Sequence, residues 1–493
     1  MRMHIALPTL ITFLVYLAAM IAVGLVTYRM TSNLSDYVLG GRSLGPGVAA
    51  LSAGASDMSG WLLLGLPGTI YGARMSKAWI AIGLTIGAYL NWQFVARRLR
   101  IYTEVANDSI TVPDFLHNRF EDRTRLLRVF SALVILVFFA FYTSAGMVAG
   151  AKLFEASFGL NYYAALWGGG AVIVSYTFLG GFLAVAWTDF VQGIIMFFAL
   201  LIAPALAVTT QGGWSETVAQ VGAVDLSYNN IMSGMSLFSI ISLAAWGLGY
   251  FGQPHIIVRF MAMRDHRDVP TARLIGIAWM VISLFGAIAV GYTGIAYFAD
   301  NPLPDHEKVF ILMATALANP WIAGFLLAAI LAAIMSTISS QLLVSSSALA
   351  EDIYKAFVRP RASETELVWV GRIGVLVIAV IALLIAGNPD SKVLDLVAYA
   401  WSGFGAAFGP VVLFSLFWRR TTQWGALAGM LVGAITVIVW KQLSGGIFQM
   451  YEIVPGFILC SLVLVLVSLV TRPSESVLAS FDAAAARWRR VTN

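Results

Sequence analysis

Charge and cysteine are both scarce in this chain of 493 residues, and each scarcity argues against a class of protein. Only 11% of the residues are charged, whereas soluble globular proteins carry about 25%. So few charges cannot cover a water-facing surface of this size, which argues against a soluble enzyme, a nucleic-acid-binding protein and a disordered chain. The single cysteine, Cys460, excludes a disulfide within the chain and a thiolate metal site. The five histidines lack the spacing of metal ligands: His4, His117, His255, His266 and His306.

Motifs for nucleotides and for catalysis are also missing. The glycine-rich stretches lack the Lys-Ser/Thr pair of a P-loop and its strand-to-helix setting. We therefore expect no nucleotide to act on this chain, and no arrangement of nucleophile, base and acid predicts an enzyme. We also expect no nucleic acid and no obligatory protein partner.

Long apolar runs are what the sequence has in abundance. Hydrophobic residues make up 59% of the chain, and a transmembrane helix needs about 20 of them in succession. The runs are continuous, unlike the alternating segments of about 10 residues in outer-membrane barrels. The pattern predicts an all-α polytopic membrane protein with thirteen transmembrane helices in a single domain, 1–493. The expected spans are 7–28, 46–72, 78–96, 127–150, 163–180, 186–209, 234–258, 273–298, 320–348, 367–387, 393–418, 423–443 and 452–471.

The basic residues predict how these spans are oriented. If the N-terminus lies outside, 23 of the 30 lysines and arginines fall on the inner side. Cytoplasmic loops are enriched in Lys and Arg, so we expect the N-terminus outside and the C-terminus in the cytoplasm. The net charge of +5 belongs to these loops and does not indicate nucleic acid. After residue 472, Ala483–Arg490 is predicted to form an interfacial or solvated helix.

Two of the spans contain enough glycine and proline to interrupt a helix. The second span holds Ser52–Trp61 with Gly54 and Gly60, and the seventh holds Trp246–Pro254. Unwound backbone at membrane depth survives only where it lines a cavity or is buried in protein. Paired interrupted helices in corresponding positions are typical of secondary transporters with inverted repeats. The alternative is that these glycines only allow close helix packing.

The spacing of the two interrupted spans places the repeats. The seventh span lies five spans after the second, so the two have opposite orientations. We expect inverted repeats at about 46–209 and 234–418, with peripheral helices at 7–28, 423–443 and 452–471.

Two groups of residues could hold a cation. Asp57 stands at the interruption of the second span, where an aspartate costs about 2.5–3.5 kcal/mol to insert. It either takes part in cation coupling or caps the broken helix, and the two roles are compatible. In the ninth span, Ala333, Ser336, Thr337 and Ser340 share one helix face. Their oxygens suit a hard cation such as Na⁺, although a Ser/Thr face can also serve only to pack helices.

Aromatic residues near the interruptions could hold a small organic solute. Trp246 and Tyr250 are one turn apart on the seventh span, Trp61 follows the interruption in the second, and Tyr142 lies in the fourth. Their faces attract a substrate ammonium, and the exposed N–H groups of a half-helix attract a carboxylate. Ordinary aromatic packing is the alternative.

Four further charged residues lie at the ends of expected spans. Asp189 is expected to cap the sixth span or to act at a gate, and Lys392 and Asp395 lie at the outer start of the eleventh. Arg259, at the inner end of the seventh span, is expected to reach lipid phosphate.

Four motifs resemble the sodium/solute symporter family: Ser52–Trp61, Gly180–Val185, Trp246–His255 and Ala332–Thr337. The resemblance covers nearly the whole chain. It implies a leucine-transporter-like fold with a 5+5 inverted repeat. It also implies Na⁺-coupled uptake of L-proline across a bacterial inner membrane by alternating access.

The resemblance further implies the residues of the site. Na⁺ would bind the carbonyl oxygens of Ala55, Met58 and Ala333 and the hydroxyls of Ser336 and Thr337, with Asp57 as the essential acid and Li⁺ as a partial substitute. The residues expected around proline are Ser56, Ser59, Gly60, Trp61, Tyr142, Trp246, Tyr250, Gln253 and Pro254.

Other functions stay open at this point. The coupling ion could be H⁺ if Asp57 carries the proton, and the solute could be another small zwitterion or carboxylate. A channel, or a transporter-like membrane sensor, would use a similar set of helices. The short chain after residue 472 argues against a sensor, and two interrupted helices suit alternating access better than a continuous pore.

Overall fold

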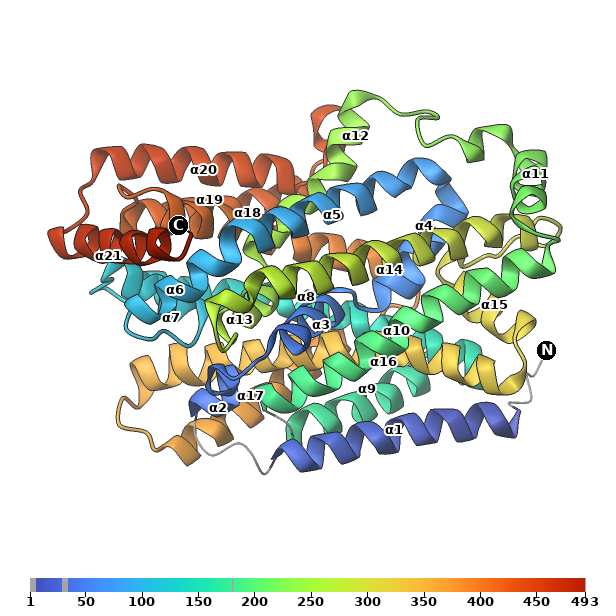
Figure 1. The fold of residues 1–493 in the computed structure, drawn as a ribbon, viewed down its shortest axis with the longest axis horizontal. Helices are drawn as coiled ribbons and strands as arrows, with labels where there is room; N and C mark the ends of the chain where they lie inside the picture. The colour runs from blue at the N-terminus through green and yellow to red at the C-terminus, as the bar shows by residue number, and fades with distance from the viewer. Residues whose placement is uncertain (1–5, 29–33, 180, 493) are drawn as a thin grey trace.

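Helices running side by side along one direction make up the structure, a computed structural model that describes residues 6–28, 34–179 and 181–492 (Figure 1). His4 and Gly180, named above, lie outside these ranges, as do Arg2 and Arg29, which belong to the 30 basic residues counted above. The α-helices are α1 Leu7–Tyr28, α2 Leu34–Leu39, α3 Pro46–Asp57, α4 Leu66–Ala73, α5 Trp79–Leu90, α6 Arg97–Val105, α7 Val112–Phe120, α8 Leu126–Phe158, α9 Tyr162–Leu179, α10 Phe182–Thr210, α11 Trp214–Val224, α12 Leu237–Ala244, α13 Pro254–Met261, α14 Val269–Tyr297, α15 Val309–Leu317, α16 Pro320–Ser347, α17 Glu364–Ile385, α18 Val393–Phe417, α19 Gln423–Trp440, α20 Ile453–Val470 and α21 Glu475–Thr492.

The all-helical fold class is confirmed. Each expected span coincides with helical segments, and nine helices among the described residues are long and apolar enough to cross a membrane. Three shorter apolar stretches, Leu7–Val23, Trp61–Ala73 and Leu237–Gly252, belong to the first, second and seventh expected spans. The count of thirteen crossings and the boundaries of the repeats stay predictions.

The second expected span is interrupted where its glycines predict. Pro46 occupies the first turn of α3, where a missing N–H costs no hydrogen bond. The helix ends at Asp57, and Met58 then turns away with φ −78° and ψ 64°. A π-helical turn, Trp61–Gly65, and α4 continue the span.

The seventh expected span is interrupted by a change of helix type. Between α12 and α13 the chain forms a 3₁₀ segment, Ala245–Gly252, of eight residues. Runs of 3₁₀ helix longer than three or four residues are uncommon because their hydrogen bonds are poorer. Pro254 then starts α13 at its first position. The unwound segment thus contains three glycines, the last of them at its end, and a proline follows it.

Neighbouring helices bring the two interruptions together in the core. α3 packs against α10, α13, α14 and α16, while the 3₁₀ segment packs against α5 and α18. α16 is almost entirely buried, which explains why its Ser and Thr side chains face protein. The interrupted helices therefore lie inside the protein, as unwound backbone at membrane depth requires.

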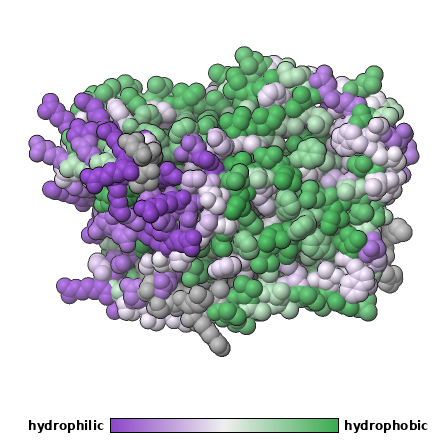
Figure 2. Space-filling view, viewed as in Figure 1, coloured by the Kyte–Doolittle hydropathy of each residue, from purple (hydrophilic) through white to green (hydrophobic). Residues whose placement is uncertain are grey.

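Hydrophilic residues gather at one end of the molecule, over α6, α7 and α21, and hydrophobic residues cover much of its middle (Figure 2). α1 begins at the opposite end from α21 (Figure 1). The expected helix at Ala483–Arg490 is longer than predicted, because α21 spans Glu475–Thr492. It docks on α6 and α7, and Arg419 pairs with its Asp482 at 2.7 Å.

Candidate ion and solute site

Asp57 lies at the point where the two interrupted helices meet. It is the last residue of α3 and is 2% exposed. One carboxylate oxygen accepts a hydrogen bond from the hydroxyl of Tyr250, which lies in the 3₁₀ segment. The other oxygen, Oδ1, is buried and has no hydrogen-bond partner among the described residues. A carboxylate oxygen in this position is available to a cation or to a solute ammonium.

The main-chain carbonyl of Asp57 also accepts hydrogen bonds. It accepts hydrogen bonds from the Ser59 N–H at 2.8 Å, the Trp61 indole at 3.1 Å and the Tyr142 hydroxyl at 3.2 Å. The last carbonyls of a helix have no partner within it and must find one elsewhere. Three of the predicted solute residues thus also satisfy the interrupted backbone.

Four of the five residues predicted to hold Na⁺ come together between α3 and α16. The Ser336 hydroxyl lies 2.8 Å from the Ala55 carbonyl oxygen and 3.1 Å from that of Ala333. The Thr337 hydroxyl lies 3.4 Å from the Ala55 oxygen. Met58, the fifth predicted ligand, is fully buried at the end of α3. The donors are carbonyl and hydroxyl oxygens, the ligand type that hard cations prefer.

Aromatic rings surround the other side of the interruption. The ring centroids of Trp61 and Trp246 are 6.3 Å apart, and Trp246 also stacks on Tyr451 at 5.2 Å. Trp401, from α18, packs against Trp246 at 6.4 Å and Tyr250 at 5.1 Å. Sequence reasoning missed Trp401 and Tyr451, because nothing local to either residue shows which ring it meets.

The remaining predicted solute residues lie around the same interruptions. The Ser56 hydroxyl donates to the Ala53 carbonyl within its own helix, and the Ser59 hydroxyl accepts from the Trp61 N–H. A Cβ atom at Gly60 would lie 2.7 Å from that of Ala149, so α8 approaches the backbone closely there. The Gln253 amide donates to the Gly249 carbonyl, and Pro254 begins α13.

A buried ion pair lies beside Ser52, five residues before Asp57 in α3. Arg259, expected at lipid, is instead fully buried, and its guanidinium donates to Asp189 Oδ2 at 3.1 Å. The expectation was wrong because an arginine at this depth finds a carboxylate and the Ser52 and Ser340 hydroxyls within reach. Asp189 does not cap a helix, since α10 begins at Phe182. Ser340, on the predicted ion face, belongs to this pair.

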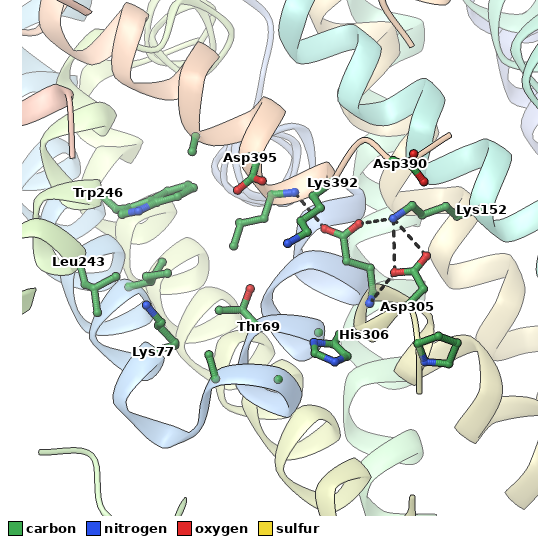
Figure 3. A pocket seen from close by; sticks show the side chains of 18 of the residues that line it. Thr69, Lys77, Lys152, Leu243, Trp246, Asp305, His306, Asp390, Lys392 and Asp395 are labelled. Atoms are coloured by element: carbon green, nitrogen blue, oxygen red, sulfur yellow. Dashed lines mark hydrogen bonds and ion pairs between the residues drawn. The ribbon is translucent and has the colours of Figure 1, made fainter. Parts of the chain in front are cut away.

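The molecule also has an open cleft of about 620 Å³ (Figure 3). It lies where α4 ends and where α15 and α18 begin. Trp246 lines this cleft and contacts Trp61, so it stands between the cleft and the buried rings. Lys392 and Asp395 lie at the start of α18, which corresponds to the start of the eleventh expected span, and they line this cleft. The Glu307 carboxylate pairs with Lys152 at 2.7 Å and accepts from the Val393 N–H at 3.0 Å. This contact holds the start of α18 against α8.

Comparisons with known proteins point in one direction. The profile of the sodium:solute symporter family matches residues 37–433. The sodium/proline symporter of Salmonella typhimurium is 57% identical over 95% of this chain and 94% of its own length. That of Escherichia coli is 54% identical over 99% and 98%, and the high-affinity proline transporter of Bacillus subtilis is 55% identical over 94% and 98%.

Two solved structures share the fold. A Na⁺-coupled sialic acid symporter in a substrate-bound outward-open state superposes with a TM-score of 0.79, covering 96% of this chain and 100% of that chain at 19% identity. A nucleobase-cation-symport-1 family transporter gives 0.55, covering 90% and 98% at 17% identity. The predicted leucine-transporter-like fold is confirmed.

Proposed function

The chain belongs to the sodium:solute symporter family, and on that premise we propose that it couples the entry of Na⁺ to the uptake of L-proline. Its relatives in Salmonella typhimurium and Escherichia coli, more than half identical over nearly their whole length, are sodium/proline symporters. The membrane is then the bacterial inner membrane, with the N-terminus in the periplasm and the C-terminus in the cytoplasm.

The observation that carries the proposal is the oxygen cluster between α3 and α16. Ser336 and Thr337 reach the Ala55 carbonyl across 281 and 282 residues of sequence. Carbonyl and hydroxyl oxygens at the end of an interrupted helix suit Na⁺, whereas a proton carried by Asp57 needs no such cluster. We therefore favour Na⁺ over H⁺ as the coupling ion. Li⁺, another small hard cation, should replace it in part, and K⁺ should not.

The rings supply the solute side of the proposal. Trp61, Trp246 and Tyr250 present faces that attract a secondary ammonium, and their apolar surface suits a small saturated ring. The Tyr250 hydroxyl, in the 3₁₀ segment, donates to the Asp57 carboxylate. Asp57 is also only two residues from Ala55, whose carbonyl is a proposed Na⁺ ligand. Na⁺ near α3 would thus order the same residues that hold proline, which is a physical basis for coupling.

Alternating access would open the site, which both interrupted helices line, first toward one side of the membrane and then toward the other. Trp246 lines the open cleft (Figure 3) and also packs against the buried ring of Trp61. Beside Ser52, nearer the start of α3, the Arg259–Asp189 pair joins α13 to α10. Opening toward the cytoplasm would require these contacts to part, whereas opening toward the cleft would require Trp246 to move.

The test is uptake of radiolabelled proline into proteoliposomes containing the purified protein. An inward Na⁺ gradient should drive accumulation, Li⁺ should drive less, and K⁺ none. Accumulation of another zwitterion but not proline would correct the solute. Exchange that is indifferent to any ion gradient, or proline binding without transport, would contradict a symporter and favour a channel or a sensor.

A further inference from the structure

Trp401 of α18 lies directly against the unwound segment. Its side chain is 1% exposed. A Cβ atom built on Gly249 would lie 1.9 Å from its indole nitrogen. Only a glycine at position 249 allows the indole to lie directly on the backbone there.

Hydrogen bonds tie Trp401 to both ends of that segment. The indole N–H donates to the Trp246 carbonyl at 2.7 Å, near the start of the 3₁₀ run. The Trp401 carbonyl accepts from the Gln253 amide at 3.1 Å, just past its end. A long 3₁₀ run has weak internal hydrogen bonds, so contacts from outside are needed to hold its shape.

The same indole lies behind the rings that the solute would meet. It stacks on Trp246 with 28° between the ring planes and meets Tyr250 edge to face at 84°. Protein interiors are close-packed and yield little. A rigid ring behind Trp246 and Tyr250 therefore limits how far they can move apart for a larger solute.

We infer that Trp401 is a positioning residue that sets the ring size of the transported amino acid, an inference that rests on the proposed proline uptake. By fixing the Trp246 carbonyl and backing both rings, it holds the site at the width of a five-membered ring. One additional methylene in a closely fitted pocket changes specificity by about 10- to 200-fold. Trp246 and Tyr250 would thus exclude the six-membered homologue of proline only because Trp401 prevents them from moving apart.

The variant Trp401→Phe tests this, because it keeps an aromatic ring but removes the N–H donor and part of the volume. We expect the KM for proline to rise about tenfold, the effect of one lost hydrogen bond of about 1.4 kcal/mol. Uptake of the six-membered homologue, pipecolic acid, should rise relative to proline by about tenfold. Trp401→His keeps a ring N–H and should recover part of the KM without recovering the selectivity.

The ratio of the two uptake rates, measured in the same proteoliposomes, does not depend on how much variant protein folds. Trp279→Phe is the matched control. Its indole also donates to a backbone carbonyl, that of Gly193 at 2.9 Å, and it joins α14 to α10. That variant should leave the ratio unchanged.

Two failures can be told apart. If the unaltered protein does not accumulate proline with Na⁺, the proposed function is wrong. If it does, but Trp401→Phe keeps the selectivity ratio of the unaltered protein and of Trp279→Phe, the role of Trp401 is wrong.

Discussion

At the scale of one residue, Asp57 connects the two interrupted helices. Its carbonyl accepts three donors, its Oδ2 accepts one from Tyr250, and its Oδ1 is buried with no hydrogen-bond partner among the described residues. A buried carboxylate oxygen without a hydrogen bond is costly, and Asp57 follows Ala55, whose carbonyl meets the Ser336 and Thr337 hydroxyls, by two residues. A positive charge from Na⁺ or from the solute ammonium would remove that cost.

The first prediction concerns the charge of Asp57. Asp57→Asn should reduce Na⁺-driven proline uptake nearly to that of empty vesicles, because the amide keeps the shape and loses the charge. Asp57→Glu should retain a fraction with weaker Na⁺ affinity. Uptake is measured with a Na⁺ gradient at fixed pH, then with a pH gradient without Na⁺. Strong uptake in the second condition, lost in Asp57→Asn, would make the protein a proton symporter.

The second prediction separates ion binding from solute binding at Thr337. Its hydroxyl lies 3.4 Å from the Ala55 carbonyl, so Thr337→Ala should raise the Na⁺ concentration for half-maximal uptake about tenfold. The proline KM at saturating Na⁺ should change less. Ser346→Ala on the same helix is the control, since that hydroxyl donates to the Leu343 carbonyl of its own helix. An unaltered Na⁺ dependence in Thr337→Ala would remove Thr337 from the site.

At the scale of helices, close contact between backbones holds the unwound segment in place. Gly83 and Gly87 of α5 face it, and a Cβ atom at Gly87 would lie 2.1 Å from the Gly247 carbonyl oxygen. On the other side of the segment, α18 places Trp401 on Gly249. Small residues at such crossings let helices approach within a membrane protein, and here they let a straight helix support an unwound one.

The third prediction uses this contact. Gly87→Ala should push α5 away from the 3₁₀ segment, lowering the Tm of the protein in detergent and raising the proline KM. Gly168→Ala is the control, because that glycine lies in a helix with nothing within 4 Å of the added atom. Both variants gain the same helix propensity. Equal Tm and KM in the two would show that the Gly87 contact does not support the segment.

How far sequence could predict this fold depended on whether the cause was local. Glycine and proline act within a few residues, so the sequence locates the interruptions near Gly60 and Gly252. Helix periodicity is also local, so the sequence places Ser336 and Thr337 on one face of the ninth span. The Arg259–Asp189 pair joins residues 70 positions apart, and the Trp401–Trp246 hydrogen bond spans 155. Nothing near Arg259 distinguishes a buried partner from a lipid phosphate, and nothing near Trp401 indicates the glycine beneath it.

At the scale of the whole molecule, the two ends differ in character. Hydrophilic residues gather over α6, α7 and α21 (Figure 2), where the loops rich in arginine lie. The opposite end carries the cleft, with Lys77, Lys392 and Asp395 among its lining residues. The excess of basic residues predicts that the α21 end faces the cytoplasm, so the cleft would face the periplasm and receive solute from outside.

This orientation makes a prediction about the driving force. Proline is a zwitterion without net charge, so entry with one Na⁺ carries one positive charge inward. Each charge is worth about 2.3 kcal/mol per 100 mV, or close to fifty-fold in the equilibrium accumulation ratio. An inside-negative potential, imposed with a K⁺ gradient and valinomycin, should therefore accelerate uptake at constant Na⁺ and raise its final level. The same potential without Na⁺ should have no effect, which controls for leakage. If uptake followed the Na⁺ gradient but ignored the potential, an equal charge would have to leave in each cycle, and simple Na⁺:proline symport would be wrong.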